Sequence, residues 1–276
     1  MSLKDRIGID LGRRVPVEEG IAFAAKNGVR YIDAQMDIAP NAMESFDDAR
    51  CAGIREACAK AGLHLGLHTL SAVNIAEVSP FLRDAADQYL RAYMDLAKRL
   101  GAEWIVVHAG YHFTSDKKLR MQAALDRLKR AVDYAEKTGT FLVLENLNGE
   151  PELAEVHYLA SNLEECHYFF DQITSPRLGW SFTINHAHYD PVGIDGFIDG
   201  MDMSRCAEVR MADNNGLYEI HMKPGEGTVD FGRMIRRIEA TGFKGHYMNG
   251  FGTIEDMLAG RDYIVARAEE AGVKVA

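Results

Sequence analysis

Short apolar or β-branched segments alternate along this chain with longer segments whose apolar residues recur at three- and four-residue spacing. This alternation is typical of parallel strands joined by crossover helices, and eight such pairs follow one another. The expected strands cover residues 7–11, 31–35, 63–70, 104–109, 141–147, 178–184, 208–213 and 246–251. The pattern therefore predicts an α/β fold built on a parallel sheet.

The clearest expected helix covers residues 81–100. Ser79 and Pro80 precede it as cap and first-turn proline, and Gly101 is expected to end it. Other helices are expected to end in the same way just before the next strand, at Gly28, Gly62 and Gly242. Because the array is regular and the sequence contains no Pro/Ser-rich linker, we expect a single domain that spans residues 1–276.

A closed barrel and an open doubly wound sheet both consist of such units. The open fold usually carries a glycine-rich phosphate turn after its first strand. Here that turn is GRRVP at residues 12–16, which lacks GxGxxG and Walker spacing. (β/α)8 barrels typically need roughly 250 residues in one piece, and the chain has 276. We therefore predict a (β/α)8 TIM barrel.

Composition narrows the classes of partner. The formal net charge of −10 would repel phosphate backbones, so nucleic acid is not an expected partner. No window approaches the ~20 apolar residues of a membrane span, and no signal-peptide pattern opens the chain, so we expect a cytoplasmic protein without a membrane partner. The cysteines lack CxxC spacing and are expected to be reduced thiols; they are Cys51, Cys58, Cys166 and Cys206.

Polar residues stand where the expected strands end, and barrel enzymes carry their reactive residues at these ends. Imidazoles and carboxylates that converge beside an apolar core must share protons, a metal or a ligand. The sequence thus predicts a functional site at this rim. Its candidates, in chain order, are His68, His108, Glu145, Asn146, His186, His188, Arg210, Asp213, Glu219, His221 and Asn249.

The same segments carry a family resemblance. The motifs are VVHAG at 106–110, VLEN at 143–146, NHAH at 185–188, DN at 213–214, EIH at 219–221 and GEGTVDF at 225–231. Together with His68-Thr69 and VNIA at 73–76, their order resembles the xylose isomerase-like TIM-barrel superfamily. That superfamily includes endonuclease IV, hydroxypyruvate isomerase, inosose dehydratase and the ketose 3-epimerases.

The resemblance implies a divalent metal held by Glu, Asp, His and Glu from strands five to eight. Glu145 matches the first ligand, but Thr183, Arg210 and either Asn249 or Gly250 stand where the other three are expected. An arginine at this place puts a positive charge where the metal would lie. It either stabilises an enediolate or binds a substrate carboxylate, or it pairs with Glu145.

A metal in another place is also compatible with the resemblance. His68, His108 and Glu145 match the residues that hold one zinc in endonuclease IV, and two histidines with a carboxylate suit catalytic zinc. Another of its zinc sites is matched by His186, Glu219 and His221. Two interpretations stay open: one divalent ion (zinc, manganese or magnesium) at the first set, or a metal-free pocket in which the histidines bind substrate.

The resemblance implies an isomerase or epimerase that acts on a small sugar or polyhydroxy carbonyl compound through an enediolate. Glu145 is then the general base, His108 or His186 the acid, and Arg210 and Asn249 orient the substrate. The residues expected to contact substrate besides Asn249 are His68, Asn146, His188, Asp213, Glu219 and His221. A lyase or dehydratase on a sugar-derived or keto acid, and a non-catalytic carbohydrate-binding barrel, stay open. Relatives also suggest a homo-oligomer.

Overall fold

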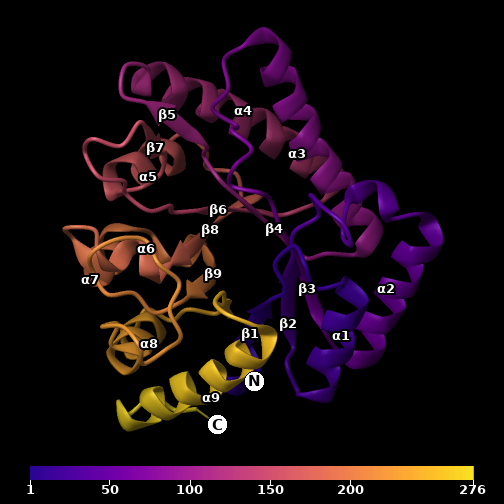
Figure 1. Ribbon diagram of the computed structural model, residues 1–276, viewed down its shortest axis with the longest axis vertical. Helices are drawn as coiled ribbons and strands as arrows, with labels where there is room; N and C mark the ends of the chain where they lie inside the picture. Colours follow the sequence, from indigo (N-terminus) through magenta and orange to yellow (C-terminus); the bar gives the residue numbers. More distant parts are fainter. Residues whose placement is uncertain (276) are drawn as a thin grey trace.

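Eight parallel strands close into a barrel in the computed structural model, which describes residues 1–275 (Figure 1). They are β1 Ile7–Asp10, β2 Tyr31–Ala34, β3 His64–His68, β4 Trp104–Val107, β6 Leu142–Glu145, β8 Leu178–Thr183, β9 Cys206–Met211 and β10 His246–Asn249. Around the barrel the order is β1-β10-β9-β8-β6-β4-β3-β2. The single-domain TIM barrel is therefore confirmed, and each expected strand overlaps an observed one.

Helices surround the barrel on its outer side (Figure 1). They are α1 Val17–Lys26, α2 Asp48–Ala61, α3 Pro80–Leu100, α4 Lys117–Thr138, α5 Leu163–Phe170, α6 Ile184–His188, α7 Gly193–Gly200, α8 Phe231–Ala240 and α9 Ile254–Glu270. Single 3-10 turns cover Lys4–Arg6, Met43–Ser45 and Met203–Arg205.

The helix expected over residues 81–100 is α3, which begins one residue earlier, at Pro80. It ends at Gly101, whose φ of 69° lies in the left-handed region that glycine adopts without steric cost. The buried side chains of α3 begin at Ala86, whereas Phe81 and Leu82 are exposed. The first turn of α3 therefore extends beyond the core.

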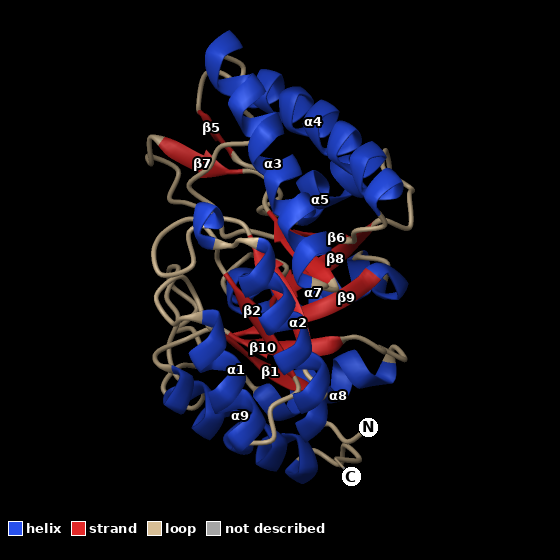
Figure 2. Ribbon diagram, turned by 90° about the vertical axis from the view of Figure 1, so that its right-hand side faces the viewer, coloured by secondary structure: helices blue, strands red, loops and turns tan. Residues whose placement is uncertain are grey.

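A two-stranded antiparallel ribbon lies beside the barrel, separate from its strands (Figure 2). It pairs β5, Tyr111–Phe113, with β7, Val156–Tyr158. This ribbon was not expected from the sequence, because strands of three residues are too short to show an alternation of apolar and polar side chains. The ribbon carries Tyr158 to the carboxyl ends of the barrel strands, where this ring lines a cavity.

The interior of the barrel has an apolar layer and a polar layer. The apolar layer consists of Trp104, Val106, Val143 and Met248. Because side chains alternate between the two faces of a strand, the last inward-facing position of a strand lies at its carboxyl end. The inward-facing polar residues at the last position of a strand, or one position before or after it, are Asp10, Asp33, His68, His108, Glu145, Thr183 and Arg210. They form the polar layer.

All four cysteines are buried free thiols. Burial raises the pKa of Cys58 to about 11, so this thiol stays protonated at neutral pH. Within residues 1–275, no helix has both the length and the apolar composition that crossing a membrane requires.

Candidate active site

A cavity of about 290 Å³ opens above the polar layer, at the carboxyl ends of the strands. Barrel enzymes carry their active sites at this end. Of the residues expected at the site, those that line the cavity are His68, His108, Glu145, His186, Arg210, Glu219 and His221. They come from six different strands and loops, so the closure of the barrel brings them together.

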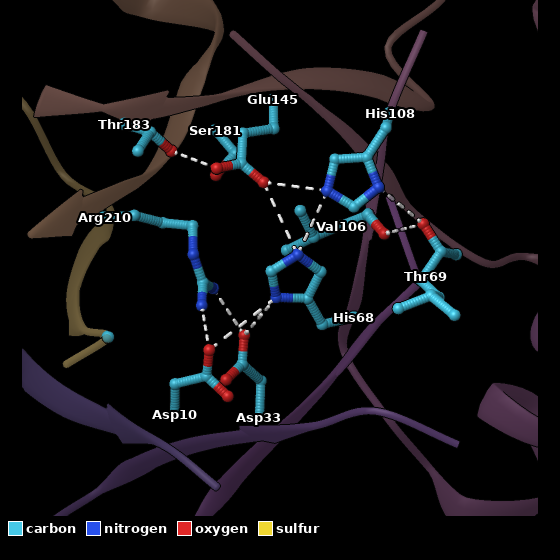
Figure 3. A network of polar contacts seen from close by, with 12 residues as sticks. Asp10, Asp33, His68, Thr69, Val106, His108, Glu145, Ser181, Thr183 and Arg210 are labelled. Carbon is cyan, nitrogen blue, oxygen red and sulfur yellow. Dashed lines mark hydrogen bonds and ion pairs between the residues drawn. The ribbon is translucent and has the colours of Figure 1, made fainter. Parts of the chain in front are cut away.

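One wall of the cavity holds a cluster of two imidazoles and a carboxylate (Figure 3). His68 Nε2 lies 3.2 Å from His108 Nε2, and Glu145 Oε2 lies 3.0 Å from His108 Nε2 and 3.4 Å from His68 Nε2. All three side chains are buried. In a tetrahedral zinc site with bonds of about 2.0–2.2 Å, ligand atoms lie roughly 3.3–3.5 Å apart. The three atoms are close to such an arrangement.

The hydrogen bonds around His108 determine which of its nitrogens carries a proton. Thr69 Oγ1 donates to the Val106 carbonyl oxygen and lies 3.2 Å from His108 Nδ1, so it accepts a hydrogen bond from that nitrogen. Burial lowers the pKa of His108, which makes the ring neutral at pH 7. Its Nε2 is then a bare lone pair that faces the Glu145 carboxylate. Two acceptors in contact require a positive charge between them.

A proton on His68 or a metal ion can supply that charge. Burial and Arg210 lower the pKa of His68, but Glu145 and Asp10 more than offset them, so this pKa is raised. Burial in turn raises the pKa of Glu145, but the adjacent His108 and His68 imidazoles hold it well below its usual range. Glu145 is therefore ionised and a weak base. Thr183 donates to its other oxygen, Oε1, at 2.5 Å.

The cavity is also lined by a second cluster, His186, Glu219 and His221, and His186 Nδ1 lies 3.7 Å from Glu145 Oε1 of the first cluster. His186 Nδ1 donates to the Asn146 carbonyl oxygen at 2.8 Å, and His221 Nδ1 donates to that of Gly250 at 2.6 Å. The two Nε2 atoms lie 3.3 Å and 2.7 Å from Glu219 Oε1. Histidines that bind metals almost always donate the other ring N–H to a carbonyl or carboxylate, so this cluster too could hold a cation.

The second cluster differs from the first in its protonation and exposure. Burial lowers the pKa of His186, but Glu219 and Glu145 more than offset this effect, so the pKa is raised. Burial raises the pKa of Glu219, while His186 and His221 bring it to about 2. The His221 side chain is 48% exposed. A protonated His186 can thus exchange its proton with solvent through its neighbours.

Arg210 also lines the cavity and is surrounded by carboxylates (Figure 3). Its Nη1 donates to Asp33 Oδ2 at 2.6 Å and to Glu208 Oε1 at 3.2 Å, and its Nη2 donates to Asp10 Oδ2 at 2.5 Å. A pairing with Glu145 was one expectation from the sequence; the observed partners are these three acids instead. Its positive charge is therefore already compensated within the chain.

Four expected site residues lie outside the wall of the cavity. The Asn146 side chain forms hydrogen bonds with the backbone N–H and carbonyl oxygen of Thr183 in β8. Asn249 donates to the Met257 carbonyl oxygen in α9. His188 bonds Thr228 Oγ1 at 2.8 Å. Asp213 is fully buried and accepts hydrogen bonds only from backbone N–H groups of its own loop. In this structure these residues support the site and do not face its substrate space.

Asp10, Asp33 and Glu208 belong to the site but were not predicted as its members. A signal for them exists. Asp33 stands two residues after Tyr31, and Glu208 stands two residues before Arg210. Residues two apart on a strand point to the same face, so each pair shares the inward face of its strand. The polar wall also includes Asn148 and Tyr158. These two stand on loops, for which strand periodicity gives no signal.

Comparison with known proteins places these features in context. A family model described as xylose isomerase-like TIM barrel matches residues 21–251. An uncharacterized protein of Methanocaldococcus jannaschii is 25% identical over 214 residues, which are 75% of this chain and 70% of that protein. Fructoselysine 3-epimerase of Escherichia coli O157:H7 is 25% identical over 167 residues, 59% of this chain and 58% of the enzyme. A crystal structure of a D-tagatose 3-epimerase-like protein superimposes with a TM-score of 0.80 at 20% identity, covering 98% of this chain and 100% of that one.

Proposed function

This chain belongs to the xylose isomerase-like TIM barrel family, and from that premise we propose that it is a sugar isomerase or epimerase. The reaction is a proton transfer beside the carbonyl group of a small sugar or related polyhydroxy carbonyl compound. The observation that carries this proposal is the pair of adjacent histidine-carboxylate clusters that line one cavity. A relative that is 25% identical is named as a sugar 3-epimerase, which supports the same class of reaction.

The first cluster suits a divalent metal ion. Its three donor atoms converge, and the bare Nε2 of His108 faces the ionised Glu145 at 3.0 Å. The ligands would be His68, His108 and Glu145. A divalent ion there would polarise the carbonyl group of the substrate and make the adjacent C–H more acidic. This assigns Glu145 to metal binding instead of the role of general base that the sequence suggested.

The proton transfer itself falls to the second cluster. His186 has a raised pKa and is oriented by its hydrogen bond to the Asn146 carbonyl oxygen, so it is a proton donor aimed into the cavity. In its neutral form His186 can accept the substrate proton at Nε2 and then return it, and Glu219 stabilises the protonated form. General acid–base groups of this kind typically contribute 10²- to 10⁴-fold in rate.

The surroundings of Arg210 do not favour a lyase or dehydratase that binds a substrate carboxylate. Asp10, Asp33 and Glu208 already accept from both terminal nitrogens of this guanidinium. A substrate anion would have to displace one of these acids. A neutral sugar would not have to displace any of them. We infer that the role of Arg210 is to balance the negative charges of the polar layer below the cavity.

Deuterium exchange tests the proposed reaction. The metal-loaded protein is incubated in D2O with D-fructose, D-tagatose, D-psicose or L-ribulose, and the C–H beside each carbonyl is followed by NMR. We expect exchange with at least one ketose, and a loss of about 100-fold or more in His186→Gln. Glu56→Gln, which alters an exposed carboxylate on α2, is the matched control.

The alternatives give different outcomes in the same experiment. Exchange with none of the ketoses would contradict an isomerase or epimerase. If such a protein still bound a ketose, it would be a non-catalytic carbohydrate-binding barrel. Loss of water from D-gluconate, tested alongside, would instead identify a dehydratase.

A further inference from the structure

A groove of about 720 Å³ adjoins the catalytic cavity. The two spaces share Asn148, Tyr158 and Glu219 in their walls. A molecule bound in the cavity can therefore extend into the groove past Tyr158. The groove is the larger space of the two, so it can hold a substituent at least the size of the reacting sugar.

Aromatic and apolar side chains form much of the groove. Tyr158 comes from β7, Tyr189 follows α6, and Leu217 and Tyr218 belong to the loop after β9. The Tyr189 hydroxyl donates to the Gly149 carbonyl oxygen at 2.5 Å, which fixes that ring. Leu217 is 78% exposed and Tyr218 54% exposed. Exposed large apolar side chains beside a cavity are typical of a surface that a ligand covers.

The charges of the groove all have one sign. Its wall contains the carboxylates Glu150, Asp190 and Glu219, and among residues 1–275 it includes no lysine, arginine or histidine. Glu219 is paired with His186 and His221, which lie outside this wall, so the negative charge of the groove comes from Glu150 and Asp190. Glu150 accepts a hydrogen bond from the neutral Asn148 amide at 2.7 Å, which leaves its charge uncompensated. Burial, followed by the charges of Glu219, Glu150 and Asp190, raises the pKa of Tyr189. The groove is therefore a region of negative potential.

We propose that this groove binds an ammonium group carried by the substrate, so that the sugar in the catalytic cavity bears an amine-containing substituent. Tyrosine faces attract cations, and uncompensated carboxylates add to that attraction while they repel anions. A plain monosaccharide would fill the cavity but leave the groove empty. This assignment of substrate class rests on the proposed function of the cavity, whereas the binding of a cation to the groove does not.

Three probes of similar shape and different charge test the groove: benzylammonium, benzyl alcohol and benzoate. Each is titrated into the full chain at low salt and followed by NMR. We expect benzylammonium to bind about two- to fivefold more tightly than benzyl alcohol, and benzoate not to bind. Glu150→Gln should remove most of that preference. Tyr218→Ala should weaken benzylammonium, and Tyr218→Phe, which keeps the aromatic face, should restore it.

Equal affinities for benzylammonium and benzyl alcohol, unchanged in Glu150→Gln, would overturn the assignment in favour of a neutral substituent. Absence of binding by all three would overturn the groove as a ligand site. Neither readout depends on turnover. A protein that binds benzylammonium in the groove but exchanges no ketose proton would contradict the proposed function alone.

Discussion

The Nε2 atoms of His68 and His108 lie 3.2 Å apart inside the barrel. At this distance at most one of the two nitrogens carries a hydrogen atom, because two N–H groups would point at each other. Glu145 Oε2 contacts both. The three groups therefore need a shared proton or a cation between them, and a divalent ion satisfies all three groups at once.

The metal content of the protein, purified without chelators, tests this site. We expect about one divalent ion per chain in the wild type and little in Glu145→Gln, because the variant loses the charged ligand. Elemental analysis gives the stoichiometry. Glu56→Gln, an exposed carboxylate on α2, should retain the ion. Two ions per chain would show that His186, Glu219 and His221 also bind a metal, which would contradict their proposed role in proton transfer.

Thr69 should affect metal affinity without touching the ion. Its hydroxyl accepts from His108 Nδ1 and so directs the Nε2 lone pair toward the cluster. We expect Thr69→Val, which keeps the side-chain shape, to weaken metal binding about 10- to 100-fold, as is typical for partners of ligating histidines. Titration against a competing chelator measures the change. Unchanged affinity would mean that His108 is not a ligand.

The fold could be predicted because most barrel strands contain a short apolar or β-branched run, and a segment with helical periodicity follows it. Trp104–Val107 and Leu142–Glu145 are two such runs, buried along their whole length. The ribbon of β5 and β7 could not be predicted, because its three-residue strands pair residues that are distant in the chain, such as Tyr111 and Tyr158.

Of the residues predicted for the candidate site, only some line the cavity, and strand geometry explains which of them do. Glu145 and Asn146 are adjacent, but neighbouring residues of a strand point to opposite faces. Glu145 therefore faces the cavity, whereas the Asn146 side chain bonds the β8 backbone. Asn249 likewise points toward α9. The ends of strands indicate where a site lies. Which side chains enter it depends on whether each position faces the inside or the outside of the barrel.

Replacing Arg210 should mainly affect stability. In Arg210→Met the buried acids Asp10, Asp33 and Glu208 lose their shared cation, and removal of one partner of a buried ion pair costs about 3–5 kcal/mol. Urea unfolding at pH 7 measures the loss. The exposed Arg236→Met on α8 should stay within about 0.5 kcal/mol of the wild type. A loss no larger than that of the control would show that the arginine is not needed for the fold.

The pH dependence of stability should report Glu208. Burial raises the pKa of this carboxyl, but Arg210 and His246 bring it to about 2, below its ordinary value of 4.5. A depressed carboxyl pKa stabilises the fold above pH 4.5, and this stabilisation is lost as the pH falls toward 2. The difference in unfolding free energy between wild type and Glu208→Gln should therefore be constant from pH 7 to 5 and shrink at pH 4 and 3. A difference that grows on acidification would contradict this linkage.

Asp213 should act on the second cluster through the loop that carries it. Its two carboxylate oxygens accept from the backbone N–H groups of Asn214, Gly225, Gly227 and Val229, at 2.8–3.0 Å. A side chain on Gly227 would collide with this carboxylate, so the loop is built closely around it. An amide in its place offers one accepting oxygen and turns an NH2 group toward two of the four donors.

We therefore expect Asp213→Asn to lower the free energy of unfolding by about 1–3 kcal/mol, the cost of buried donors without partners. The loop over residues 214–228 should also become sensitive to limited proteolysis, and the proton exchange that depends on His186 should slow, because Glu219 lies on this loop. Glu226→Gln alters an exposed carboxylate of the same loop and serves as the control. If Asp213→Asn slowed exchange while its loop stayed as resistant to protease as the control, Asp213 would have to contact the substrate itself, as the sequence had suggested.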